Sequence, residues 1–297
     1  MKRKSCPICS SIALREICRL NKSNTEAFTK FSELKYQGYL SEIVNAGIIP
    51  IINHCHACDF YFYQNLPSDE QLSIMYGKGT FLFDKEKRVI AEERKVTFLR
   101  ELLEDLTGLT QKSVSIKDMT LLDFGSGTGT LAKIAADQGF QTTAYEPSLQ
   151  RNEISNSRNL TFTNDLQSLG IEKFDIIILN QVLEHVVDPI ATLRQLVSLS
   201  NKKTLVYVAV PNLNNELKKN DLWEQWPFNF KNTHIMAPFE HLNGFTPSSF
   251  TKAIDSAGLK PLPFVKNLSF SPRYALIKLL HRMFTIGGTT RVVCQIK

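Results

Sequence analysis

Short apolar runs alternate with segments of mixed polarity through the second half of the chain. Residues 174–179 are almost all apolar, as is typical of a strand that is covered on both faces of a sheet. Four further runs have the length of strands and lie at 121–124, 142–146, 160–162 and 204–211. Because helical segments separate several of them, this order predicts an α/β fold with a mostly parallel sheet.

The pattern on either side of these runs predicts further elements. Between Asp84 and Leu106 the apolar positions recur mostly at helical spacing, which indicates a long helix packed on the sheet. Thr246 followed by Pro247 predicts a helix start, and Gly258 predicts its end. The last predicted elements are a strand at 260–265, an inserted amphipathic helix at 271–285 and a strand at 290–296.

The strand at 121–124 runs into a glycine-rich turn, Asp123-Phe124-Gly125-Ser126-Gly127-Thr128-Gly129. Glycines let the backbone turn sharply and approach a ligand closely, and a helix start offers N–H groups to anionic atoms. A dinucleotide fingerprint needs glycine at the position of Thr130, and no Gly-Lys-Ser/Thr of a P-loop follows. The turn therefore predicts a site for another small polar ligand, with an ordinary tight turn as the alternative.

Polar side chains follow the later strands near their predicted carboxyl ends. Glu146 lies about 20 residues beyond the glycine turn, where a ribose-binding carboxylate is expected. Asp165 and Leu166 come shortly after the third strand, and Asn180 and Gln181 come directly after the fourth. Open α/β sheets bind ligands at this edge, so these residues are candidates for the same site.

Together these motifs resemble the class I S-adenosylmethionine-dependent methyltransferases. The phrase from Asn180 to Pro189 is similar to the fourth-strand motif of those that act on small molecules. The resemblance implies a seven-stranded, doubly wound Rossmann-like sheet, with Asp123 by the cofactor's ammonium group and Asp165 and Leu166 at its adenine. The implied cofactor-binding residues are Asp123, Gly125, Ser126, Gly127, Gly129, Glu146, Asp165, Leu166, Asn180 and Gln181.

Two Cys-x-x-Cys pairs stand near the start of the chain. Cys6 with Cys9 and Cys55 with Cys58 supply four thiolates, which suffice for a tetrahedral structural Zn²⁺ site, and a redox pair is the alternative. The gap between the pairs exceeds that of the compact pattern, so we expect a helical insertion at about 25–44. We expect a cytoplasmic protein with reduced cysteines, because no run is long and apolar enough for a membrane helix and no secretory signal is recognisable.

The second cysteine pair opens a longer phrase that continues with an aromatic strand at 59–63, a Pro-Ser-x-Glu helix and Tyr76. This phrase resembles the one that joins a zinc ribbon to the catalytic domain in sugar C-methyltransferases and related glycan-pathway enzymes. The resemblance implies a sugar acceptor, nucleotide-linked by preference, and places Tyr76 near the cofactor, with a core role as the alternative. Those relatives carry a further carboxy-terminal domain, whereas the elements predicted here stop at the seventh strand of the sheet. Transfer to oxygen or nitrogen therefore stays open beside transfer to carbon. We expect a zinc ribbon over 1–75, a connecting segment over 76–112 and the methyltransferase domain over 113–297.

Methyl transfer to a proton-bearing acceptor needs a base near the carboxyl ends of the fourth and fifth strands. His185 follows the fourth strand, and Glu240 and His241 follow the fifth, so these three are the candidate catalytic residues. The residues from 212 to 245 are rich in aromatic and amide side chains. They are expected either to form a substrate lid or to pack a small core of their own.

Composition and charge narrow the partners further. The chain of 297 residues is 43% hydrophobic and 22% charged, which is typical of globular proteins, and its net charge is +6. Seven Lys or Arg residues and no acids follow Ser256, so weak contact with an anionic surface is expected there, or simply a solvated face. Nucleic acid is disfavoured because, apart from Lys2, Arg3 and Lys4, the basic residues do not cluster with the cysteines or with the aromatic segment. The oligomeric state is left open. The alternatives to a small-molecule acceptor are an RNA or protein substrate and a non-catalytic assembly module.

Overall fold

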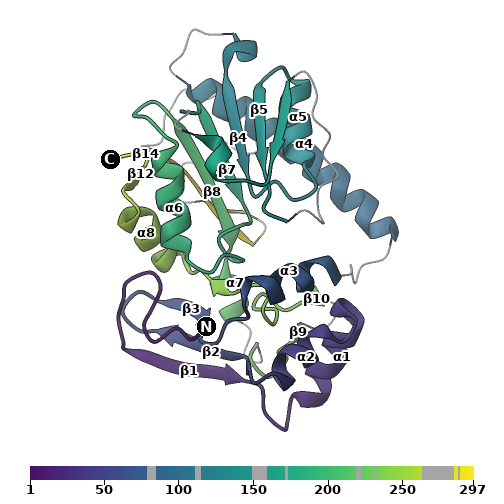
Figure 1. Ribbon diagram of the computed structural model, residues 1–297. Coiled ribbons are helices and arrows are strands. Elements are labelled where there is room, and N and C mark those ends of the chain that lie inside the picture. The colour runs from purple at the N-terminus through teal and green to yellow at the C-terminus, as the bar shows by residue number, and fades with distance from the viewer. Residues whose placement is uncertain are drawn as a thin grey trace.

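The computed structural model describes residues 1–78, 85–110, 115–148, 159–170, 173–218, 222–229, 232–262, 284–286 and 288–297. Figure 1 shows a large sheet with helices on both faces and, below it, a smaller sheet built mainly from the start of the chain. Among the described helices, none combines the length and the apolar character that crossing a bilayer requires.

The large sheet has the strand order β12-β14-β8-β7-β4-β5-β6. Its parallel strands are β4 (Thr120–Phe124), β5 (Gln141–Tyr145), β6 (Leu160–Thr163), β7 (Ile176–Asn180) and β8 (Leu205–Pro211). The strands β12 (Leu259–Pro261), β13 (Phe284–Ile286) and β14 (Thr289–Ile296) complete it, and β14 is antiparallel to β8. This arrangement confirms the predicted α/β fold with seven strands in one path.

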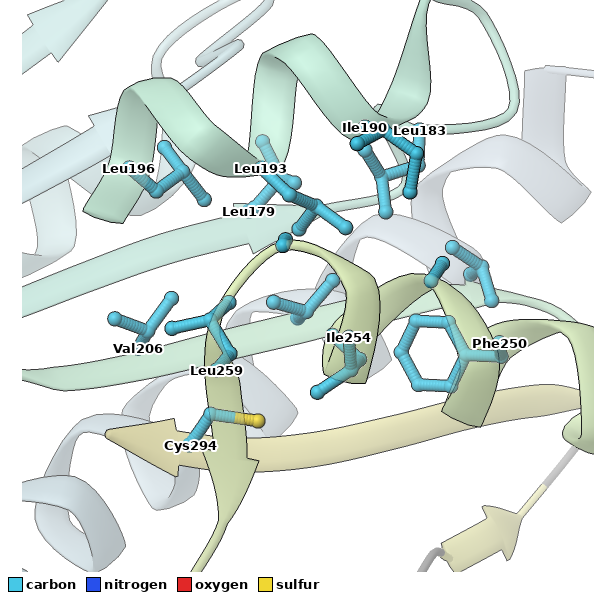
Figure 2. Close-up of a cluster of buried hydrophobic side chains, with 14 of the residues drawn as sticks. Leu179, Leu183, Ile190, Leu193, Leu196, Val206, Phe250, Ile254, Leu259 and Cys294 are labelled. Carbon is cyan, nitrogen blue, oxygen red and sulfur yellow. The ribbon is translucent and has the colours of Figure 1, made fainter. Parts of the chain in front are cut away.

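Helices cover both faces because alternate residues of each strand point to opposite sides. On one face, α6 (Pro189–Ser198) and α8 (Pro247–Ser256) pack on Leu179 and Val206, as Figure 2 shows. On the other face, α4 (Lys85–Leu109) and α5 (Thr130–Asp137) pack on side chains such as Ile178 and Tyr207. The predicted cap is present, since Thr246 and Ser249 form a capping box at the start of α8.

A second sheet forms around the cysteine pairs. It contains β1 (Leu14–Arg19), β2 (Ile51–Cys55) and β3 (Phe60–Tyr63), and the helices α1 (Thr25–Tyr36) and α2 (Tyr39–Asn45) lie between its first two strands in sequence. The helix α3 (Asp69–Lys78) follows β3. Helices therefore occupy the expected insertion between the cysteine pairs.

The fourth strand of this N-terminal sheet comes from the far side of the sequence. β11 (Asn243–Gly244) follows β8 by about 30 residues and pairs antiparallel with β3. A Cβ at Gly244 would lie 2.6 Å from the sulfur of Met236, so the close approach of the chain at this point requires glycine. The predicted boundary between domains is thus crossed by one shared strand.

The aromatic segment predicted to form either a lid or a small core of its own packs against the N-terminal helices. It contains α7 (Leu213–Leu217), β9 (Phe228–Asn229) and β10 (Asn232–Thr233). Trp226 is buried, and its Nε1–H donates to the hydroxyl of Tyr63 and the carbonyl of Met236, both at 3.0 Å. Its ring also stacks on Phe28 of α1. Trp226 therefore serves a core and does not face a ligand.

The inserted helix expected at 271–285 needs one correction. Residues 263–283 lie outside the described residues, as do four of the seven basic residues after Ser256. Residues 284 and 285 belong to β13 and not to a helix, because Phe284 and Thr285 pair with Arg291 and Thr290 in a hairpin with β14. The helical spacing of apolar residues does not extend that far.

A buried arginine joins the two sheets. The Arg3 guanidinium donates to the carbonyl oxygens of Tyr63, Leu242 and Val187, which belong to β3, the approach to β11 and the loop after β7. Burial lowers the pKa of Arg3 to about 10, so the side chain remains charged at neutral pH. We expect Arg3→Met to lower the free energy of unfolding by about 2 kcal/mol, because two buried carbonyls and one partly buried carbonyl lose a charged donor.

Denaturant unfolding measures this loss. The matched control is Arg15→Met, which removes an exposed arginine of β1 and should change the unfolding free energy by less than about 0.5 kcal/mol. Equal decreases in the free energy of unfolding of the two variants would show that the contacts of Arg3 do not stabilise the fold.

Candidate active site

The glycine turn after β4 has the backbone that its sequence predicts. Gly125, Gly127 and Gly129 have φ angles of 77°, 55° and 74°, in the left-handed region that other residues avoid. The N–H groups of Gly125 and Ser126 donate to the carbonyl of Tyr145 at the end of β5, at 2.8 and 3.0 Å. The turn is therefore held against the neighbouring strand, and Gly129 leads directly into α5.

Glu146 locks the turn to the next strand. Its carboxylate is buried, and it accepts the N–H of Gly127 at 2.9 Å and the N–H of Ser148 at 3.0 Å. Asp123, also buried, is the last residue but one of β4 and lies at the base of the same turn. The structure thus brings together the predicted ammonium-binding and ribose-binding acids on either side of the glycines.

The close packing of Gly125 against Val182 can be tested by substitution. A Cβ on Gly125 would lie 2.6 Å from Cγ2 of Val182, in the segment that follows β7. We expect Gly125→Ala to lower the free energy of unfolding by about 2 kcal/mol, from backbone strain together with this overlap. The control is Gly47→Ala, because Gly47 has a φ of 92° but no atom within 4 Å of its Cβ position. Thermal unfolding gives the melting temperatures of both variants. Equal decreases in the two would show that the contact with Val182 does not contribute to the loss.

The remaining predicted cofactor residues lie at the carboxyl ends of β6 and β7. Asp165 is exposed, and one oxygen accepts the N–H of Gln167 at 2.9 Å, while Leu166 is half-buried beside it. Asn180 ends β7, and Gln181 follows with a φ of 59°, which is rare for a residue with a side chain. Its N–H donates to the carbonyl of Ala209 in β8. Gln181 thus turns the chain sharply off the sheet edge.

The three predicted catalytic residues lie together beyond this turn. The imidazole rings of His185 and His241 have their centres 4.7 Å apart in an edge-to-face arrangement. Nδ1 of His185 donates to the carbonyl of Glu240 at 2.7 Å, and Nδ1 of His241 donates to the carbonyl of Ile235 at the same distance. Tyr76 of α3 completes the group, with its ring 6.2 Å from that of His185. Burial lowers the pKa of His241.

The helical insertion of the N-terminal region reaches this group, which the sequence did not indicate. Tyr36 donates its hydroxyl hydrogen to Glu240 at 2.6 Å, and the ammonium group of Lys35 pairs with the same carboxylate at 2.5 Å. Burial alone would raise the pKa of Glu240, but the charges of His241 and Lys35 and the hydrogen bonds of Lys35 and Tyr36 lower it to about 2. Glu240 is therefore a carboxylate at neutral pH.

Glu184 is a second acid that sequence reasoning did not select. Its side chain is only 2% exposed, and desolvation by burial raises its pKa to about 8. One of its oxygens, Oε1, lies 3.8 Å from Nε2 of His185. The only sequence signal was its place beside His185 in the phrase after β7, which gives no hint of its burial.

The four predicted zinc-binding cysteines form one cluster. Their sulfur atoms lie within 4.8 Å of one another, with Cys6 to Cys58 at 3.5 Å and Cys9 to Cys55 at 3.6 Å, and none forms a disulfide. Zinc–sulfur bonds of about 2.3 Å in a tetrahedron place neighbouring sulfurs about 3.8 Å apart. The cluster therefore has the size and ligand set that a Zn²⁺ ion requires.

Comparison with known proteins agrees with this architecture. Residues 91–263 match the family model of a methyltransferase domain. No curated protein matches the chain. Similar solved structures include a chain of the complex between the Haloferax volcanii Trm112 methyltransferase activator and a putative methyltransferase (16% identity, 72% of this chain and 99% of that one, TM-score 0.44).

Two more similar structures are an O-methyltransferase family protein from Burkholderia thailandensis (12% identity, 77% and 60% covered, TM-score 0.47) and a Synechocystis PCC 6803 magnesium protoporphyrin IX methyltransferase with bound SAH (14% identity, 78% and 90% covered, TM-score 0.45). These likenesses are too distant to indicate an acceptor. The family match spans more than half of the chain, so the chain belongs to the methyltransferase-domain family and is an S-adenosylmethionine-dependent methyltransferase.

Proposed function

We propose that the protein transfers a methyl group from S-adenosylmethionine to a small-molecule acceptor, and that the acceptor is a sugar, nucleotide-linked by preference. One observation carries the first part of this proposal. The glycine turn touches the segment after β7 at Val182, and that same segment bears Glu184 and His185. A donor in the turn would therefore lie beside a group of imidazoles and carboxylates.

The residues of the turn fit the proposed donor. Among the described residues, no atom lies within 4 Å of the Gly127 Cβ position, so the backbone there can approach a ligand closely. Asp123 offers a carboxylate for the ammonium group, and Glu146 offers one for the ribose hydroxyls, while its contacts to Gly127 and Ser148 hold it in place. Asp165 and Leu166 at the next strand end are the proposed adenine contacts.

The neighbouring polar group fits the task of activating an acceptor. Methyl transfer from a sulfonium is an in-line displacement, so the protein must align the acceptor, exclude water and remove its proton. We assign acceptor activation to the group that contains His185, Glu240 and His241. Lys35, Tyr36 and Tyr76 line it from the N-terminal helices, so the N-terminal region supplies part of the acceptor site.

The sugar assignment rests on the phrase from Cys55 to Tyr76, which resembles the one in sugar C-methyltransferases and related glycan-pathway enzymes. The polar lining of the group agrees with it, because carboxylate, hydroxyl and ammonium groups bind sugar hydroxyls well. An RNA substrate bound by the region around the four-cysteine cluster is less well supported by the sequence. The only charged residues between His54 and Tyr76, setting histidines aside, are the acids Asp59, Asp69 and Glu70.

Calorimetry with S-adenosylmethionine, followed by a screen of nucleotide sugars for formation of S-adenosylhomocysteine, tests the proposal. We expect donor binding and turnover with at least one nucleotide sugar. Donor binding with turnover of RNA or protein alone would refute the sugar acceptor, and no donor binding would refute the function as a whole.

Glu146 gives a sharper test of the donor site. We expect Glu146→Ala to weaken binding of S-adenosylmethionine about 100-fold, because two ribose hydroxyls lose a charged acceptor and Gly127 loses its anchor. Asp137→Ala, which removes an exposed acid at the end of α5, should leave the affinity within about twofold. Calorimetry on both variants decides, and an unchanged affinity in Glu146→Ala would place the ribose elsewhere.

We also propose that the four-cysteine cluster holds a structural Zn²⁺ ion. All four ligands are thiolates from the protein, which leaves no position for a reacting molecule. The ion would fix the turn after Cys6 and the β2–β3 turn to each other, and so hold the N-terminal sheet in shape.

A further inference from the structure

The group beside the donor turn contains more ligating atoms than a proton transfer needs. We infer that Glu184, His185 and His241 bind a divalent transition-metal ion, and that this ion holds and activates the acceptor. The inference rests on the proposed methyl transfer, which it deepens by naming how the acceptor is held. This site is separate from the four-cysteine cluster.

The distances suit a metal after small side-chain rotations. One ligand atom from each of the three residues lies within 4.8 Å of the other two, and Oε1 of Glu184 is 3.8 Å from Nε2 of His185. Metal–nitrogen and metal–oxygen bonds of about 2.0 to 2.2 Å place neighbouring ligand atoms about 3.3 Å apart in a tetrahedron. Bringing Oε1 of Glu184 and Nε2 of His185 closer by about half an ångström would give this pair that spacing, and rotation of the His241 side chain would bring its ligand atom to the other two.

The orientation of the imidazoles is the one that metal-binding histidines adopt. A backbone carbonyl can only accept, so the bonds from His185 to Glu240 and from His241 to Ile235 place the hydrogen on Nδ1 of each ring. The lone pair of each ring is then on Nε2. Carbonyl contacts of this kind fix the tautomer and direction of ligating imidazoles in metal sites.

Glu184 supplies a second and independent observation. It is 2% exposed, and its Oε2 atom has no hydrogen-bond partner among the described residues. Buried carboxylate oxygens without partners are costly, and an ion between Glu184 and the two imidazoles would compensate that cost. The cation of Lys35 does not serve this purpose, because it pairs with Glu240.

The ligand set indicates the kind of ion and its task. Two imidazoles and one carboxylate suit zinc, iron or manganese and disfavour magnesium, and they leave coordination positions open. An acceptor hydroxyl bound there would lose its proton to solvent more easily. Its oxygen would then form the bond to the methyl carbon, while the carbon–sulfur bond breaks and its electron pair stays on sulfur.

Cobalt titration of the zinc-loaded, full-length protein tests the inference, with metal content counted after dialysis. We expect a second metal per chain, with visible bands but without the strong charge-transfer bands that thiolate ligands give. Glu184→Gln and His241→Asn should each weaken this second binding at least about 100-fold. His56→Asn, which removes an exposed imidazole, should bind the second metal as the unaltered protein does.

The unaltered protein decides the matter even if a variant fails to fold. A single metal per chain at millimolar cobalt would overturn the inference, and so would a second metal whose affinity is unchanged in both ligand variants. Calorimetry with the donor separates this result from the proposed function. Donor binding with one metal per chain would refute the metal site alone, whereas two metals without donor binding would refute the methyl transfer on which its role depends.

Discussion

Replacing His241 with asparagine should lower kcat by about 1,000-fold while the affinity for S-adenosylmethionine stays within about twofold. The asparagine amide can still donate to the carbonyl of Ile235, as Nδ1 of His241 does, so the local backbone keeps its contact. What is lost is Nε2, which carries the lone pair of the neutral ring. The measurement is single-turnover kinetics with the acceptor found in the nucleotide-sugar screen.

The control for this variant is His56→Asn, which changes an exposed histidine of the N-terminal region and should leave kcat unaltered. Thermal unfolding of both variants checks that the fold is kept. A kcat within about threefold of the unaltered enzyme would assign His241 a structural role and move acceptor activation to other residues.

Removing the zinc should have the largest effect on stability. We expect Cys55→Ser to lose the ion and to lower the melting temperature by about 10 °C or more. Binding of structural zinc is worth about 10 kcal/mol or more in small domains, and much of that is folding free energy. Acceptor turnover should be lost with it, because Lys35 and Tyr36 come from the helices inserted between the cysteine pairs.

Zinc content and circular dichroism during heating measure this effect. Cys18→Ser is the matched control, since Cys18 lies in β1 outside the cluster and should leave the zinc content unchanged. A Cys55→Ser protein that keeps both its metal and its melting temperature would refute the structural zinc.

The elements that the sequence predicted are those with local signals. The strands β4 to β8, the glycine turn and the capped helix at Thr246 each depend on neighbouring residues, so periodicity and turn chemistry suffice to place them. The four-cysteine cluster could also be predicted from local motifs, because two Cys-x-x-Cys pairs in one chain are typical of a metal site.

The features that the sequence did not indicate depend on contacts between distant segments. Lys35 and Tyr36 meet Glu240 across about 200 residues, and nothing near either segment signals that contact. The burial of Glu184 has no local signature, since acidic side chains are usually exposed. Trp226 was assigned to a lid or to a core on composition alone, and only its contacts with Tyr63 and Met236 decide for the core.

The shared strand β11 has a consequence for biosynthesis. The partner of β3 is made about 180 residues later, so β1 to β3 leave the ribosome long before their sheet can be completed. Until then the edge of β3, with its row of aromatic residues, has no partner strand and is open to pairing with other chains. Truncated versions that end before β11 would keep this edge, which makes the two halves of the enzyme poor candidates for separate production or exchange between relatives.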